Sequence, residues 1–183
     1  MILTQDKLKE LLDYNCDTGD FFWKPRSKEL FPSDKYWKGW NTRYSGSMAG
    51  CIGTGFKTSG YRRIKINDKN HAAHRLAWLY VYGEWPHQID HINHIRHDNR
   101  IANLRNVTQA QNCQNASMYS NNKSGVIGVH YHKATKKWAA AINDKGNTIH
   151  LGIFASIEKA KAAREMASLK YGFHENHGDI KRL

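Results

Sequence analysis

Apolar residues recur at helical spacing in some stretches of the chain and alternate with polar residues in others. The first helical stretch follows the capping residue Thr4, and Leu8, Leu11 and Leu12 recur in it at helical spacing. A turn at Thr18-Gly19-Asp20 then leads into the strand-like run Phe21-Phe22-Trp23. Residues 24–60 show no sustained periodicity, and we expect long loops with brief strands there.

The middle of the chain predicts a hairpin followed by a helix. Apolar and basic residues alternate from Tyr61 to Ile66, and the turn residues 67–70 follow directly. His74 to Tyr82 has the broad apolar content of a packed helix, which we expect to end at Gly83.

The last third predicts a second, small domain. Ser117 to Ser124 is rich in Ser and Asn and predicts a linker. Three strand-like runs and one helix follow it: Gly125–Tyr131, Trp138–Ile142, Thr148–Phe154 and a helix from Ser156 to Tyr171 that ends at Gly172. We therefore expect an α+β protein with an N-terminal domain at 1–116, a linker at 117–124 and a domain at 125–183 in which three strands pack on one helix.

Charge and composition narrow the class of partner. The 28 Lys and Arg residues outnumber the 16 Asp and Glu residues, which gives a formal net charge of +12 and favours a nucleic acid, although a basic solvated surface is the alternative. No apolar run is long enough to span a membrane, and the N-terminus lacks the pattern of a signal peptide, so we expect a soluble intracellular protein. Cys16, Cys51 and Cys113 are far apart and predict neither a disulfide framework nor a zinc site.

The segment 88–115 crowds imidazoles, amides and carboxylates together. Ile89 and Ile92, and then Leu104 and Val107, are apolar points that can anchor two short strands around a polar loop. Thr108 and Gln111 match a capping box, which predicts a helix that carries Asn112. Strand, loop, strand and helix together can converge on one ion.

The residue types in this segment suit phosphodiester hydrolysis, which needs a base to activate water and a cation to neutralise the phosphate. Asp90 and Asn112 offer one carboxylate and one amide oxygen, a sparse set of hard ligands that fits a single Mg²⁺ or Mn²⁺ ion. His91, next to Asp90, can accept a proton near neutral pH.

The string from Asp90 through Asn112 resembles an HNH nuclease motif, with His91, Asn103 and Asn112 at its three named positions. The resemblance implies a beta-beta-alpha-metal core in which His91 is the general base and Asp90 and Asn112 are metal ligands. It also implies that Asn103 holds the hairpin loop and orients His91. His74-Arg75 and Asp98-Asn99-Arg100 look like phage-type HNH endonucleases, and we expect Arg75 and Arg100 to contact DNA.

One position departs from that pattern. His94 stands where related phage enzymes often have glycine. His94 and His97 are either incidental loop residues, the interpretation we favour, or ligands for a phosphate or a softer metal.

The C-terminal domain resembles the ethylene-response-type (Apetala-two-like) DNA-binding domain over residues 120–173. The landmarks are Ser124-Gly125, Gly128-Val129, Lys137-Trp138, Leu151-Gly152 and Glu158 with Ala160. In that family the sheet enters the major groove, which double-stranded DNA offers to a small β-sheet. The outward residues expected to contact DNA are His130, His132, Lys136, Trp138 and His150; for Trp138, packing on the helix is an equal alternative.

The sequence thus predicts a metal-dependent endonuclease that cleaves double-stranded DNA, of the free-standing phage homing type. One alternative is a sequence-specific DNA-binding regulator with an inactive nuclease fold, against which the intact motif argues. The other is a zinc-stabilised structural or RNA-binding protein that uses the His-rich loop, which lacks cysteine partners. The oligomeric state is not predicted.

Overall fold

The computed structural model describes residues 2–55, 60–109, 112, 118, 122–144 and 146–173. Its contacts divide the chain into two compact units, Met1–Asn106 and Val107–Leu183. The division after residue 106 lies ten residues before the domain end predicted at 116, and the residues between are in part outside the described ranges. Each unit is described by itself.

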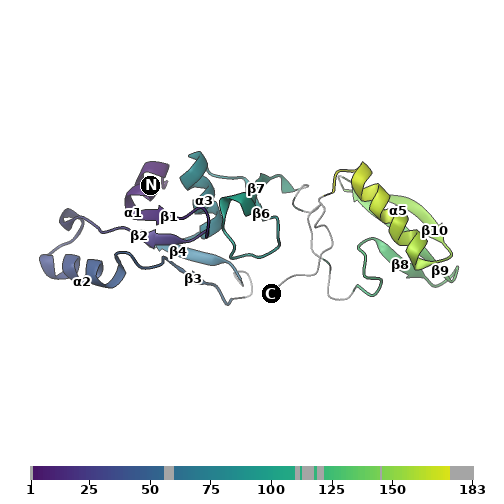
Figure 1. Ribbon diagram of the computed structural model, residues 1–183, viewed down its shortest axis with the longest axis horizontal. Helices are drawn as coiled ribbons and strands as arrows, with labels where there is room; N and C mark the ends of the chain where they lie inside the picture. The colour runs from purple at the N-terminus through teal and green to yellow at the C-terminus, as the bar shows by residue number, and fades with distance from the viewer. Residues whose placement is uncertain are drawn as a thin grey trace. The chain divides into compact units, whose positions relative to one another are not determined.

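The N-terminal unit mixes short helices with three small sheets (Figure 1). Its elements are α1 (Gln5–Leu11), β1 (Leu12–Tyr14), β2 (Phe21–Trp23), a 3-10 turn (Lys28–Leu30), α2 (Asp34–Tyr44), β3 (Cys51–Ile52), β4 (Arg62–Ile66), β5 (Lys69–Ala72), α3 (Ala73–Tyr82), β6 (Gln88–His91), a second 3-10 turn (Ile101–Asn103) and β7 (Leu104–Val107). The sheets are β1-β2, β3-β4-β5 and β6-β7. The mixed helix and sheet content confirms the α+β class.

One apolar core joins these elements. Helices α1 and α3 contact each other, and α3 also contacts β4 and β5. Fully or almost fully buried side chains fill the space between them and continue to the first residue of β7: Leu8, Leu12, Phe21, Ile64, Leu76, Leu79 and Leu104. Strands β6 and β7 are thus built on the same core as the N-terminal helix.

Local signals in the sequence account for several of these elements. The Thr4 hydroxyl accepts a hydrogen bond from the Lys7 N–H and caps α1, as predicted. Asn67 and Asp68 both have positive φ, which is typical of the tight turns that join antiparallel strands, and they connect β4 to β5. Gly83, in the left-handed region, ends α3.

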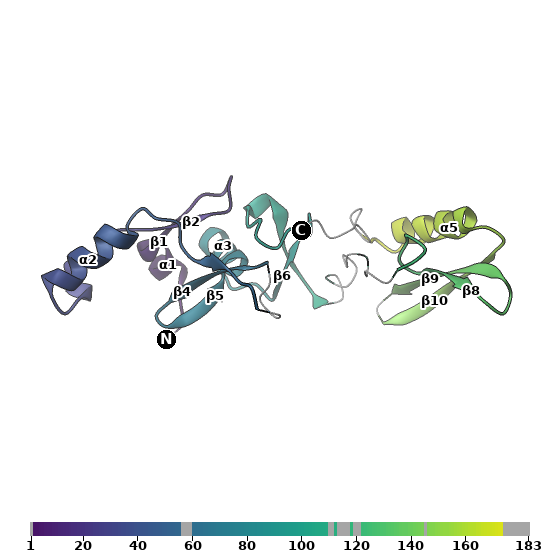
Figure 2. The same ribbon diagram turned by 90° about the horizontal axis from the view of Figure 1, so that it is seen from below.

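The expectation of loops with brief strands over residues 24–60 is wrong for α2. This helix runs for 11 residues, and at both viewing angles it lies at the end of the unit away from β6 (Figures 1 and 2). Trp37, Trp40 and Tyr44 do follow helical spacing, but Gly39 and Thr42 lower the intrinsic helix propensity between them. Packing of the aromatic residues, rather than propensity, selects the helix.

The C-terminal unit has the sheet and helix that the sequence predicts. Its elements are β8 (Val129–His132), β9 (Lys137–Asp144), β10 (Asn147–Phe154) and α5 (Ile157–Lys170). The strands are antiparallel in the order β10-β9-β8, and α5 contacts all three. The Ser156 hydroxyl caps α5 by accepting a hydrogen bond from the Lys159 N–H.

The first strand of this unit is shorter than predicted. Residues 125–128 form a turn before β8, in which Gly128 has φ of 80° and leaves no room for a side chain against the Ala141 carbonyl. The predicted linker 117–124 is in part outside the described residues. Its end is structured, because the Asn122 side chain accepts a hydrogen bond from the Ser124 N–H and donates one to the Val126 carbonyl.

In the described part of the chain, no helix has both the length and the apolar character needed to cross a membrane.

Candidate active site

The two strands β6 and β7 pair and bring the ends of the polar loop together. Just beyond the strands, the Ile92 N–H donates to the Asn103 carbonyl at 3.0 Å. Asp90 and His91, at the end of β6, are 8% and 5% exposed. A buried carboxylate and a buried imidazole both need partners, because a buried polar group without them is costly.

Asn103 holds the loop between the strands. Its side-chain Oδ1 accepts from the Asn93 N–H at 3.0 Å, and its Nδ2 donates to the Asp98 carbonyl at 2.9 Å. One side chain thus binds the backbone on both sides of the loop. This geometry agrees with the expectation that Asn103 holds the loop.

A polar network closes the same loop. Asn93 Nδ2 donates to Asp98 Oδ2 at 2.6 Å, and Arg100 Nε donates to Asp98 Oδ1 at 2.8 Å. The adjacent Arg100 guanidinium holds the pKa of the Asp98 carboxyl below its usual value. Arg100 is exposed, and its guanidinium forms an ion pair with Asp98. Its predicted contact with DNA remains a prediction.

The side chain within hydrogen-bonding distance of the His91 ring belongs to Asn99, not to Asn103. Asn99 Oδ1 lies 3.4 Å from His91 Nε2, and Asn99 itself is only 1% exposed. Burial lowers the pKa of His91, while the Asn99 contact and the Asp90 charge oppose this effect. Burial therefore favours the neutral imidazole, the form that can accept a proton.

Two aromatic rings enclose His91 from α3 and from the chain before β4. The His74 ring meets it edge to face with centroids 5.0 Å apart, and the Tyr61 ring lies 5.9 Å away. Burial lowers the pKa of His74 to about 3. The sequence pattern does not predict the contacts of Asn99, His74 and Tyr61 with His91, because they depend on how the loop and α3 fold around this ring.

Asp90 is paired with a residue of the neighbouring strand. Arg105 Nε and Nη2 donate to Asp90 Oδ2 at 2.8 and 2.7 Å. Asp90 remains a buried, hard oxygen donor. Across the described residues, no three His, Cys, Asp or Glu side chains form a group that could hold a metal, so a cation here would depend on amide oxygens, water or phosphate as well.

Asn112 lies in the other unit. Its N–H donates to the Thr108 carbonyl at 3.0 Å, so a helical turn begins at Thr108 as the capping pattern predicts. Its side chain is half-buried. Because Asp90 belongs to the first unit and Asn112 to the second, the joint metal site remains a prediction.

The β1–β2 hairpin contacts the loop between β6 and β7. The Tyr14 hydroxyl donates to the Asn99 carbonyl at 2.6 Å. Gly19, with φ of 78°, approaches so closely that a Cβ there would lie 2.4 Å from the Arg100 nitrogen. The loop that contacts His91 is thus pressed against the N-terminal hairpin.

The two loop histidines differ in their backbone. His94 has φ of 62°, in the left-handed region where glycine is favoured. His97 is exposed. As far as the structure describes the chain, neither belongs to a group of metal-ligating side chains.

Arg75 has backbone partners in the chain that follows α3. Its Nη1 and Nη2 donate to the carbonyls of His87 and Pro86 at 3.1 and 2.8 Å. The guanidinium therefore ties α3 to the start of β6. Its predicted role in DNA binding remains a prediction.

The sheet register separates two faces in the C-terminal unit. His130 pairs with Ala139 and His132 with Lys137, and directly paired residues share a face, so these residues lie on the face away from α5, as expected. His150 pairs with Ala141 on the same face. Lys136 lies in the exposed β8–β9 turn with φ of 53°.

Trp138 does not lie on this outward face. It pairs with Tyr131 and Phe154 and packs against the core formed by Val129, Ala140 and Ala160. The expectation of an outward Trp138 is therefore wrong, and the alternative of packing on the helix side holds. Strand alternation places Trp138 with Ala140 and Ile142, which are buried.

Comparison with known proteins agrees with the motif. A family model described as HNH endonuclease matches residues 71–114, which run from β5 through α3, β6 and β7 to just beyond Asn112. The chain thus carries an HNH endonuclease domain in this segment, and the class of protein it indicates is a nuclease. Comparisons with curated proteins and with solved structures gave no match.

Proposed function

We propose that this protein is a metal-dependent endonuclease that hydrolyses phosphodiester bonds in double-stranded DNA. The observation that carries the proposal is the buried His91, kept neutral by burial and held by Asn99 beside Asp90, within the segment that matches the HNH family. A neutral imidazole can accept a proton from water, so this arrangement fits hydrolysis by general-base catalysis.

In this mechanism His91 takes a proton from the attacking water. When Nε2–H donates to Asn99 Oδ1, Nδ1 keeps its lone pair and serves as the base. Asn103 keeps the loop in place through its two hydrogen bonds to the backbone, so that the Asn99 side chain stays next to the His91 ring. Asn103 is thus proposed as a positioning residue.

The metal proposed from the sequence is one Mg²⁺ or Mn²⁺ ion. Asp90 offers a carboxylate and Asn112 an amide, and hard cations of this kind accept a few protein oxygens together with water and phosphate. A bound divalent cation would neutralise charge on the scissile phosphate and the leaving oxygen. Arg105 would orient the Asp90 carboxylate, because it holds Oδ2 through two N–H groups.

The outward face of the C-terminal sheet is the proposed DNA-gripping surface. His130, His132, Lys137 and His150 lie on this face together with Ala139 and Ala141, of which Ala139 is buried. The described strand residues on this face include no acidic side chain. With the net charge of +12, this favours a polyanionic partner. From the sequence resemblances, we extend the proposal to a homing endonuclease of a phage with an Apetala-two-like domain.

Cleavage of supercoiled plasmid with Mg²⁺, Mn²⁺ or EDTA tests the proposal. We expect cleavage with either metal and none with EDTA. His91→Ala should reduce cleavage by at least about a hundredfold, because general-base catalysis contributes about 10²–10⁴, while DNA affinity stays within a few fold. His97→Ala, in an exposed part of the same loop, is the matched control and should cleave normally. Undiminished cleavage by His91→Ala would exclude this active site, and metal-independent DNA binding without cleavage would favour a regulator.

A further inference from the structure

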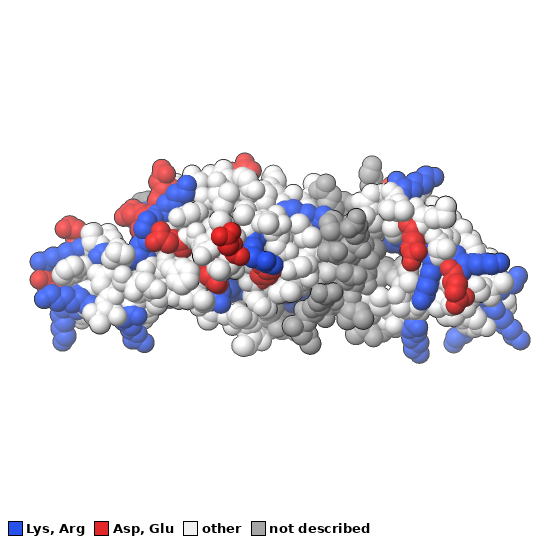
Figure 3. All heavy atoms as spheres, in the orientation of Figure 1, with Lys and Arg blue, Asp and Glu red and all other residues white. Residues whose placement is uncertain are grey.

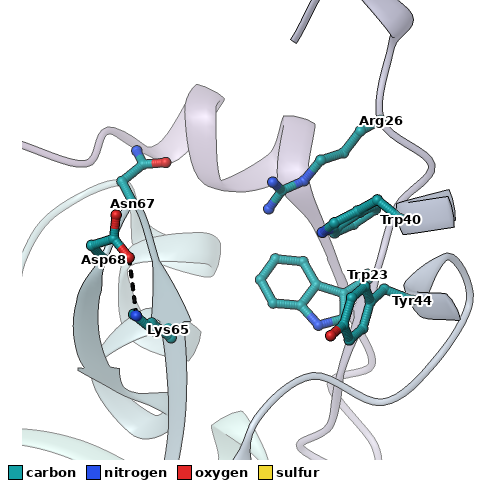
Figure 4. A pocket seen from close by; sticks show the side chains of 7 residues that line it. All are labelled: Trp23, Arg26, Trp40, Tyr44, Lys65, Asn67 and Asp68. Atoms are coloured by element: carbon teal, nitrogen blue, oxygen red, sulfur yellow. Dashed lines mark ion pairs between the residues drawn. The ribbon is translucent and has the colours of Figure 1, made fainter. Parts of the chain in front are cut away.

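A hollow lies in the N-terminal unit, outside residues 71–114. It has a volume of about 560 Å³, within the range of roughly 300–1,000 Å³ typical of ligand pockets. Its walls are aromatic and basic side chains on one side and polar side chains of the β4–β5 hairpin on the other: Trp23, Arg26, Trp40 and Tyr44 face Lys65 and Asp68 (Figure 4).

The aromatic wall joins the end of β2 to α2. The Trp23 and Trp40 rings meet edge to face with centroids 5.8 Å apart, and Trp40 and Tyr44 lie 5.4 Å apart. None of the three rings is fully buried, and Tyr44 is 36% exposed. Aromatic surface left open beside a hollow offers a platform on which a flat ring can stack.

Arg26 adds a cation to this wall. Its guanidinium carbon lies 4.1 Å from the centre of the Trp40 ring and 5.2 Å from that of Trp23. Its Nε is buried without a hydrogen-bond partner, and no carboxylate of the described residues forms an ion pair with it. A stacked guanidinium that has no carboxylate partner is suited to an oxyanion, and phosphate matches its geometry.

The opposite wall is polar. Lys65 Nζ lies 3.0 Å from Asp68 Oδ1, and Asn67 projects from the same turn (Figure 4). The ammonium group can contact a phosphate, and the amide and carboxylate offer donors and acceptors of the kind that a nucleobase edge requires.

The charge around the hollow favours an anion. Lys35, Lys38 and Arg43 are exposed on α2, and Lys and Arg side chains project from this end of the unit (Figure 3). A cationic ligand is disfavoured, because Arg26 already occupies the aromatic wall and Asp68 is paired with Lys65. A ligand that is both flat and anionic fits best.

We propose that this hollow binds one unstacked nucleotide of single-stranded DNA, its base against Trp23 and Tyr44 and its phosphate against Arg26 and Lys65. The choice of DNA rests on the proposed nuclease function, whereas the binding requires no cleavage. A displaced or unpaired nucleotide next to a duplex would be held here, in addition to the grip on double-stranded DNA.

Binding of a labelled ten-residue oligothymidylate to the full-length protein, measured by fluorescence anisotropy in EDTA, tests the proposal. Tyr44→Leu and Arg26→Gln should each weaken binding by about tenfold, because stacking and cation contacts to a base are of this order. Tyr36→Leu, on the same helix but outside the hollow, and Lys69→Gln, on the same hairpin, are the controls and should change affinity less than twofold. Lys65→Gln should weaken binding more than Lys69→Gln.

A second readout locates the contact. An oligonucleotide that carries 5-iododeoxyuridine, after irradiation and mass spectrometry, should cross-link to Trp23, Trp40 or Tyr44. Cross-links only in other parts of the chain, or equal losses in the pocket variants and the controls, would overturn the proposal. If Arg26→Gln lowers the melting temperature, the exposed positions Tyr44 and Lys65 decide the outcome. His91→Ala should bind the oligonucleotide normally, so failure of the nuclease proposal and failure of this one are distinguishable.

Discussion

Asn99 contacts His91 through its side chain and Tyr14 through its backbone. Its Oδ1 lies 3.4 Å from His91 Nε2. Its backbone carbonyl accepts a hydrogen bond from the Tyr14 hydroxyl, and a change of the side chain leaves that bond intact. Asn99→Ala should therefore lower the cleavage rate by about ten- to a hundredfold, part of the general-base contribution, because the imidazole loses the acceptor that fixes its tautomer and orientation, with little change in DNA affinity. Plasmid cleavage and DNA binding measure the two effects.

Asn99→Asp is the conservative control for this prediction. It keeps an acceptor oxygen toward Nε2, and we expect it to recover at least part of the activity lost in Asn99→Ala. Equal activity of the wild type and Asn99→Ala would show that His91 needs no partner from this loop.

His74 makes the N-terminal unit sensitive to acid. Burial lowers its pKa from 6.5 in the unfolded chain to about 3 in the folded protein, so the unfolded chain binds a proton first as the pH falls. The free energy of unfolding should therefore decrease from about pH 6.5 toward pH 3, and His91, whose pKa is also lowered, acts in the same direction.

Urea unfolding at several pH values between 7 and 5, where most carboxylates stay ionised, measures this dependence. His74→Phe keeps a ring against Tyr61 and His91 but cannot titrate, and it should flatten the curve. The exposed His97, changed to Gln, is the control. A curve unchanged in His74→Phe would exclude His74 as the source.

At the scale of elements, the two faces of the C-terminal sheet should respond differently to substitution. Trp138→Ala removes packing against the core and should cost roughly 2–4 kcal/mol of stability. His150→Ala, on the opposite face, should leave stability within about 0.5 kcal/mol and weaken DNA binding several fold. Chemical unfolding and DNA titration of both variants check this division. If Trp138→Ala weakened DNA binding without lowering stability, Trp138 would instead be a DNA-contacting residue.

The same elements show what a sequence can and cannot reveal. Local chemistry predicts the Thr4 and Ser156 caps and the turn at Asn67-Asp68, whereas the outward placement of His130 and His150 is expected from the family resemblance. Three-dimensional packing decides the rest. Helix α2 depends on contacts such as Trp23 with Trp40, and the contact of His74 with His91 joins residues far apart in the chain. Neither produces a periodic signal within a short window.

For the molecule as a whole, the two units suggest a division of labour that truncation can test. A fragment that ends near Ala116 keeps the complete motif, and we expect it to retain weak metal-dependent nicking but to lose most site preference. Cleavage patterns on a long DNA, compared with those of the full-length protein, measure both properties. Equal site preference in the fragment would place specificity in the N-terminal unit instead.

The close approach of Gly19 to Asn99 and Arg100 has a consequence for engineering. The HNH match covers residues 71–114, but the loop inside it contacts the β1–β2 hairpin, which lies outside the match, and Leu104 belongs to the same core as Leu8. The matched segment therefore depends on contacts with residues outside it. A shortened variant should therefore keep β1 and β2, because a fragment limited to residues 71–114 would lose the contacts that support the loop next to His91.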